Sequence, residues 1–174
     1  MNLYQLIVEL IDLRSFSNLW YWIMLAVMWS SASHWILGVP FDLISRARRQ
    51  GGALQTDLEL VVRVQTERLI NIADTAGVLL VAVLFFVLTT LCTLAIYYHI
   101  EFAQAVLLLL TPMSGLSLLS LRTARAIAAG DDTGDALHMR LHRLRLATQV
   151  IGMISIFVTS MFGMYQNLHI GVLG

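Results

Sequence analysis

Four long stretches of this 174-residue sequence contain no Asp, Glu, Lys or Arg: residues 15–41, 75–100, 102–121 and 146–174. As a helix rising 1.5 Å per residue, each is long enough to cross a hydrocarbon core about 30 Å thick. Hydrophobic residues make up 58% of the chain, and the mean hydropathy of +0.76 excludes an ordinary water-soluble globule. The sequence predicts one all-α, polytopic membrane domain, residues 1–174, with four transmembrane helices in a bundle. The expected spans are about 18–38, 75–98, 102–121 and 147–168.

Every basic residue is arginine, and ten of the eleven lie in the two connections between spans one and two and between spans three and four. The positive-inside rule therefore places residues 42–73 and 122–146 in the cytoplasm. With an even number of spans, both termini then face the periplasm. The acidic residues Glu9 and Asp12 argue against a cleavable signal peptide, so we expect the N-terminus to remain.

The cytoplasmic connections are themselves expected to be helical extensions of the bundle. Gly51 and Gly52 end a short basic helix. Residues 56–59 (TDLE) resemble a capping box, and no breaker separates the amphipathic stretch that follows from span two. We expect one helix of about 40 residues, about 60 Å long, that projects into the cytoplasm, with Glu59 and Arg63 as an i, i+4 pair. Span three should continue inward to Gly130, and a last helix should start near Asp135.

The cytoplasmic arginines are the main candidates for contacts outside the chain. They suit anionic lipid head groups, and docking of an acidic protein partner is the alternative. Acids in the same connections and a net charge of +0 argue against a nucleic-acid partner. The candidate contact residues are Arg46, Arg48, Arg49, Arg122, Arg125, Arg140, Arg143 and Arg145.

Of the Asp, Glu, Lys, Arg and His residues, only His34 lies well inside a predicted span. Ser30 and His34 lie one turn apart, and we expect His34 to hydrogen-bond to Ser30 or to a neighbouring helix (Thr89, Thr90 or Gln149) rather than to bind haem or a metal. The pair His138 and His142 has metal-ligand spacing, but adjacent arginines favour a solvated or lipid-facing helix. His99, Glu101 and His169 form a second weak cluster. One cysteine, Cys92, supplies no iron–sulfur ligand set. We predict no catalytic residue, no metal and no cofactor.

Span four carries the clearest packing signal. Gly152, Ser155, Thr159 and Gly163 lie along one helix face, and such small residues let two helices approach closely. In span three, Thr111, Pro112 and Gly115 predict a kink. Internal packing is the commoner use of a kinked helix, although Ser114 and Ser117 beside it would also suit a pore.

Several segments resemble a family of small four-span inner-membrane proteins of alphaproteobacteria. The resemblance covers nearly the whole chain and rests on residues 9–20 (ELIDLRSFSNLW), 33–40 (SHWILGVP), 46–49 (RARR), 101–105 (EFAQA) and 149–167. It implies a multi-pass protein of the bacterial inner membrane. The label attached to that family, a component of a Suf-type iron–sulfur assembly complex, implies an iron–sulfur maturation factor. The resemblance supplies no catalytic residue.

Packing faces and arginine-rich connections without a reaction centre favour an accessory, assembly or scaffold subunit, not an enzyme, associated with a larger inner-membrane complex. The alternative from another class is a homo-oligomeric channel or transporter with a pore between subunits.

Overall fold

The computed structural model describes residue 16 and residues 19–172, and this part of the chain is almost entirely helical. Its elements are α2 (Leu19–His34), β1 (Trp35–Ile36), β2 (Val39–Pro40), α3 (Phe41–Gln50), α4 (Gly52–Ile96), α5 (Glu101–Ala128) and α6 (Gly134–Val172). Three of them, α4, α5 and α6, are long and apolar enough to cross a membrane. The prediction of an all-α chain is confirmed, and these three helices support a membrane-spanning protein. The first predicted span, residues 18–38, is not among the candidate spans in the described part of the chain. Glu9 and Asp12 lie outside the described residues.

The first predicted span is shorter than expected. α2 has 16 residues, which corresponds to about 24 Å. It ends at His34 because the next six residues form a hairpin in which Ile36 pairs with Val39. Leu37 and Gly38 connect the two strands with φ values of 53° and 75°. Positive φ at both central residues is the signature of a type I′ turn, a conformation that a bulky residue such as Leu37 rarely adopts.

α3 follows the hairpin directly. Pro40 precedes it with φ −63°, Asp42 lies in its first turn, and Arg48 and Arg49 lie in its last turn. These charges oppose the partial charges at the two helix ends, which stabilises a short helix. Gly51 and Gly52 then have φ of 61° and 58°, a conformation that favours glycine, and the chain turns into α4.

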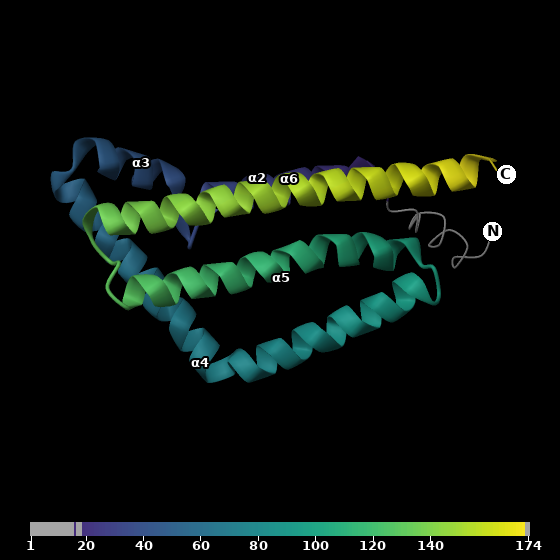
Figure 1. The fold of residues 1–174 in the computed structure, drawn as a ribbon, viewed down its shortest axis with the longest axis horizontal. Helices are drawn as coiled ribbons and strands as arrows, with labels where there is room; N and C mark the ends of the chain where they lie inside the picture. The colour runs from purple at the N-terminus through teal and green to yellow at the C-terminus, as the bar shows by residue number, and fades with distance from the viewer. Residues whose placement is uncertain (1–15, 17–18, 173–174) are drawn as a thin grey trace, which may run out of the picture.

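α4 is one continuous helix of 45 residues, which confirms that no break separates the cytoplasmic stretch from span two. It does not project away from the other helices. Figure 1 shows that α4 bends sharply near its middle and that its first half crosses the ends of α5 and α6. We call residues 52–74, which hold all its charges, the polar limb and residues 75–96 the apolar limb. Because α4 starts at Gly52, the capping box expected at Thr56 is wrong.

α5 and α6 end and begin close to the predicted residues. α5 runs past Arg122 and Arg125 to Ala128, and α6 begins at Gly134, one residue before the expected start. At the opposite end, Gln166 Nε2 of α6 donates to Gln104 Oε1 of α5 at 2.6 Å, and Gln104 Nε2 donates to the carbonyl oxygen of Ala95 in α4 at 3.1 Å. These bonds tie the three long helices together.

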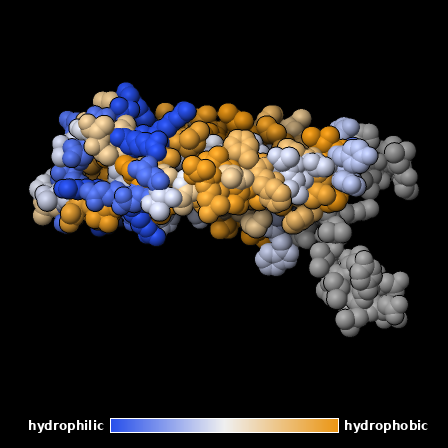
Figure 2. All heavy atoms as spheres, turned by 90° about the horizontal axis from the view of Figure 1, so that it is seen from below, coloured by the Kyte–Doolittle hydropathy of each residue, from blue (hydrophilic) through white to orange (hydrophobic). Residues whose placement is uncertain are grey.

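The largest hydrophobic core lies at the arginine-rich end of the molecule. It joins five segments that are distant in sequence: the hairpin, α3, the polar limb of α4, the end of α5 and the start of α6. We call these residues, 35–74, 122–128 and 134–145, the head. The core consists of Ile36, Val39, Ile44, Ala47, Leu58, Val62, Ile127, Leu137, Leu141 and Leu144. Figure 2 shows the hydrophilic surface concentrated at this end and an apolar surface over most of the remainder.

Outside the head, α2, α5 and α6 pack on one another. Leu25 and Trp29 of α2 contact Leu116 of α5 and, at the edge of that cluster, Ile151 of α6. The apolar limb of α4 lies alongside α5 (Figure 1), and its side chains Val78 and Phe86 are highly exposed. Such side chains require lipid or another protein around them.

Candidate functional site

The arginines of the head divide into ion-paired and unpaired side chains. Four are paired to acids in the described residues, at 2.6–3.3 Å: Arg46 to Asp42, Arg63 to Glu67, Arg125 to Asp74, and Arg140 to Asp131. These pairs are solvent-accessible, so each adds little to stability. Arg63 pairs with Glu67 and not with Glu59, so the expected Glu59–Arg63 pair is wrong. Within the described residues, the following have no acidic partner: Arg48, Arg49, Arg68, Arg122, Arg143 and Arg145.

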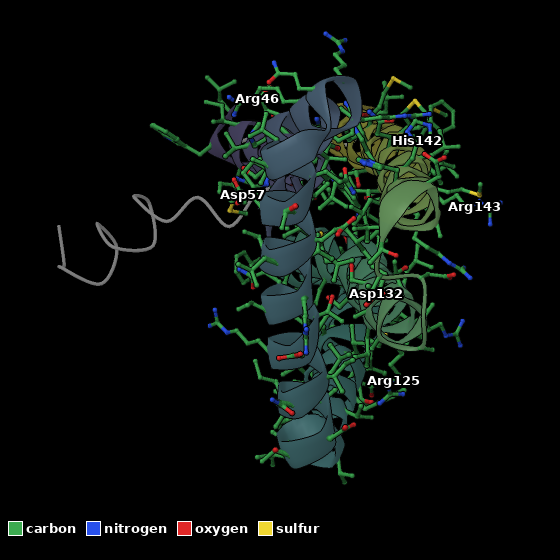
Figure 3. The ribbon with its side chains drawn as sticks, turned by 90° about the vertical axis from the view of Figure 1, so that its left-hand side faces the viewer. Arg46, Asp57, Arg125, Asp132, His142 and Arg143 are labelled. Atoms are coloured by element: carbon green, nitrogen blue, oxygen red, sulfur yellow. The ribbon has the colours of Figure 1, made fainter. Side chains whose placement is uncertain are left out.

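Figure 3 looks onto the head and shows how these charges are distributed. Arg125 and Arg143 lie on the side formed by α5 and α6, and Arg143 points away from the neighbouring helices. Asp57 lies on the opposite side of the polar limb. The head therefore presents guanidinium groups outward on a surface whose backbone is held by its own core.

A chain of hydrogen bonds links the polar limb of α4 to the start of α6. Gln55 Nε2 donates to Glu59 Oε1 at 2.7 Å, and the backbone N–H of Gly134 donates to the same oxygen at 3.0 Å. His138 Nε2 lies 2.8 Å from Gln55 Oε1. Because an amide oxygen only accepts hydrogen bonds, the His138 Nε2–H group is the donor, while the Gln55 amide nitrogen donates to Glu59. His138 is only 7% exposed, so the expectation of a solvated or lipid-facing residue is wrong for it. His142 is exposed as expected.

The network shifts the ionisation of two of its members. Burial lowers the pKa of His138 below its ordinary value of 6.5, and the charge of Arg48 lowers it further, while Asp135 and Glu59 act in the opposite direction. Its Nδ1 is buried without a hydrogen-bond partner among the described residues, so a proton there would find no acceptor. The hydrogen bonds from Gly134 and Gln55 lower the pKa of Glu59 below 4.5.

Arg145 is held differently from the other arginines. Its guanidinium carbon lies 3.4 Å above the centre of the Phe41 ring, at the start of α3. A cation stacked on an aromatic face is attracted by the electron-rich ring, and the stack fixes the plane of the guanidinium. No pattern in the sequence indicates that Phe41 has this role.

Ser30 and His34 lie together at the end of α2, beside Arg145. Both line a pocket of about 380 Å³ with Ser33, Phe41, Asp42, Ser45 and Arg145. His34 is exposed, and its ring meets the Trp35 ring edge to face at 5.8 Å between centroids. The expected hydrogen bond from His34 to a neighbouring helix is not found among the described residues. The reason is local, because α2 ends at this residue and His34 faces the pocket.

The small residues of α6 face α2. Gly152, Ser155, Thr159 and Gly163 are all buried. A Cβ atom on Gly152 would lie 2.9 Å from Trp29, and one on Gly163 would lie 3.2 Å from both Phe16 and Trp22. Absence of a side chain at these two positions is what lets the aromatic rings of the N-terminal segment pack against α6.

The hydroxyl groups near the middle of α5 are used within the helix. Thr111, Ser114 and Ser117 donate to the carbonyl oxygens of Leu107, Thr111 and Met113 at 2.7–3.0 Å. α5 continues through Pro112 as a single helix, and the expected kink stays a prediction. Two adjoining cavities of about 240 and 370 Å³ lie between the hairpin, α4 and α5, and apolar side chains such as Leu37 and Leu69 predominate in their walls.

No group of three His, Cys, Asp or Glu side chains within the described part of the chain is placed to hold a metal ion. The side chain of His169 lies outside that part, so the outer cluster with His99 and Glu101 stays undescribed. Cys92 is a free thiol in the apolar limb of α4. Comparison with known proteins finds no matching family model, no matching curated protein and no matching solved structure.

Proposed function

We propose that this chain is a scaffold or assembly subunit of a larger inner-membrane complex and that its head is the docking surface for a protein partner. The observation that carries the proposal is the combination of a closed hydrophobic core in the head with surrounding arginines that have no acidic partner among the described residues. A surface fixed by its own core binds a partner without first having to be ordered.

The choice of basic residue supports a protein partner. Lysine would satisfy the positive-inside rule as well as arginine does. Every basic residue here is nevertheless arginine. Arginine is enriched and lysine is depleted at protein interfaces, because the planar guanidinium forms two parallel hydrogen bonds to a carboxylate. We therefore expect an acidic surface on the partner.

The proposal is tested with two matched triple variants of the full chain, purified in mild detergent from native membranes. One replaces three unpaired arginines with glutamine: Arg48, Arg49 and Arg143. The other replaces three ion-paired arginines: Arg63, Arg125 and Arg140. Both remove three positive charges from the same end of the molecule, so a general effect on membrane insertion or net charge affects both.

Mass spectrometry of the co-purified proteins gives the result. We expect a stoichiometric partner with the native chain and with the variant of the ion-paired arginines. The variant of the unpaired arginines should retain at least tenfold less of that partner, which corresponds to about 1.4 kcal/mol of binding free energy. Equal loss from both triples would contradict docking through the unpaired arginines. A lone homo-oligomer would instead support the alternative, a channel or transporter with its pore between subunits.

A further inference from the structure

The pocket beside Arg145 has the chemistry of an anion site. Ser30, Ser33, His34, Ser45 and Arg145 are among its lining residues, and their side chains carry hydroxyl, imidazole and guanidinium groups. Hydroxyl, imidazole and guanidinium groups all donate hydrogen bonds. The residues come from the end of α2, the first half of α3 and α6, so the fold brings together side chains that are more than 100 positions apart in sequence.

Arg145 is oriented but not neutralised. Stacking on Phe41 fixes the face of the guanidinium, and the N–H groups lie along its edge, where a phosphate or carboxylate binds. No described acid pairs with it, and its Nε is buried without a partner among the described residues. A buried donor without a partner costs free energy, and an anion bound at Arg145 would reduce that cost.

The one carboxylate in the pocket lining is already engaged. Asp42 Oδ2 lies 3.0 Å from Arg46 Nη2. This pair contributes no net charge, so the Arg145 guanidinium gives the pocket a net positive charge. The pocket therefore favours an anionic ligand over a cationic or neutral one.

An apolar groove continues from the pocket along α2 and α6. It has a volume of about 540 Å³ and shares the Ser30 and Ser33 side chains with the pocket. Beyond these serines and Gln149, the groove is lined by Ala26, Trp29, Gly152, Met153 and Ile156. A ligand that fills both must have an anionic end and an apolar tail.

We infer that the pocket and groove together bind one anionic phospholipid, with its phosphate at Arg145 and an acyl chain along α2 and α6. The dimensions fit. From Arg145 to Ile156 the α6 backbone rises about 16 Å, and one leaflet of the hydrocarbon core is about 15 Å thick. The site lies at the edge of the head and uses Arg145, not the arginines Arg48, Arg49 and Arg143 whose replacement tests the docking surface. Lipid binding there does not depend on a protein partner.

The first test measures lipid binding by native mass spectrometry of the full chain in mild detergent. The probes are phosphatidylglycerol and phosphatidylcholine of the same chain length, and inorganic phosphate. We expect one tightly retained phosphatidylglycerol per chain and weaker retention of phosphatidylcholine. Equal retention of the two lipids, or displacement of the lipid by inorganic phosphate at equal concentration, would overturn the assignment.

The head-group contact is tested with Arg145→Gln. Loss of a charged hydrogen-bonding group should lower the affinity for phosphatidylglycerol about tenfold or more. The matched control is Arg143→Gln, which removes the same charge two residues away on an outward-facing side chain and should change the affinity no more than about threefold. Equal losses of lipid affinity in the two variants would show that the net charge of the protein attracts the lipid and that Arg145 has no specific contact with it. Arg145→Lys keeps the positive charge but lacks the planar guanidinium. Circular dichroism establishes that each variant is folded.

The groove is tested with Ala26→Phe, which places a ring where the acyl chain would lie. Its control is Val27→Phe, on an exposed neighbouring position of α2 that does not line the groove. We expect Ala26→Phe alone to release the lipid. Unchanged retention in Ala26→Phe would show that no acyl chain occupies the groove and would refute the proposed site.

Discussion

Two buried residues of α6 show how much depends on single atoms. Gly152 has no room for a Cβ, because Trp29 would lie 2.9 Å from it. His138 has one nitrogen bonded to Gln55 and the other buried without a partner among the described residues. Sequence periodicity indicated the first position and not the second, because the partner of His138 lies 83 positions away.

The glycine prediction compares two substitutions in membrane helices. Gly152→Ala should destabilise the fold by about 1–3 kcal/mol, since the Trp29 ring must move. Gly115→Ala adds the same methyl group at a helical position with nothing within 4 Å. It should be neutral or stabilising by up to about 1 kcal/mol through helix propensity. Thermal unfolding in detergent measures both, and similar midpoints for the two variants would contradict close packing at Gly152.

The pH prediction follows from the lowered pKa of His138. Between its ordinary value of 6.5 and the lower value in the folded state, the unfolded chain binds a proton that the folded chain does not. Titration of His138 therefore does not change the free energy of unfolding above pH 6.5. Below pH 6.5 the free energy of unfolding falls, by at most about 1.4 kcal/mol per pH unit. Glu59, whose pKa is also lowered, adds a second loss only below pH 4.5.

Thermal unfolding of the native chain and of His138→Gln, followed by circular dichroism from pH 7.5 downward, separates the two contributions. The glutamine variant can still donate to Gln55 but cannot take up a proton. Its midpoint should stay flat where that of the native chain begins to fall. The same slope in both proteins would place the titrating group elsewhere.

At the scale of elements, α4 is the helix that differs most from expectation. Its continuity was predictable because no glycine or proline interrupts residues 56–76. Its polar limb was expected to project past the bilayer into the cytoplasm, and the structure shows that it packs across the ends of α5 and α6 through Leu58 and Val62 (Figure 1). Their spacing indicates an apolar helix face, but spacing alone does not identify the helices that pack against that face.

Packing of the polar limb is tested with two neighbouring leucines. Leu58 is 0% exposed and Leu60 is 61% exposed. Leu58→Ala should cost about 2–5 kcal/mol and open the head, while Leu60→Ala should change stability by no more than about 0.5 kcal/mol. Limited proteolysis of the polar limb measures opening directly. If the two variants are cleaved at equal rates, the limb is not held by this core.

The hairpin shows why the end of the first span was mispredicted. Residues 35–40 are as apolar as a membrane span, so hydropathy does not separate them from α2. The turn depends on Leu37, a residue type that gives no turn signal. Ile36 and Val39 are almost completely buried in the head, so tertiary packing stabilises a local conformation that the sequence disfavours. The clustering of the arginines, by contrast, predicted which segments form the polar end of the molecule, but it did not predict that these segments share a hydrophobic core.

For the whole molecule, the polar end seen in Figure 2 predicts one orientation. With the head in the cytoplasm, single cysteines at Thr56 and Thr133, introduced into a Cys92→Ser background, should not react with an impermeant thiol reagent in intact cells and should react after lysis. Both residues are exposed, so protection before lysis reflects the membrane and not burial. Labelling of either position in intact cells would reverse the predicted topology.

The composition of the head core also dictates an order of biogenesis. Its ten buried residues begin at Ile36 and end at Leu144, and the last three come from the start of α6. A ribosome must therefore synthesise more than four fifths of the chain, including the apolar limb of α4 and all of α5, before the core can close. Until then the apolar faces of α3 and the polar limb remain uncovered. A nascent chain stopped before Leu137 would expose them, which makes such a truncated product a substrate for chaperones and proteases.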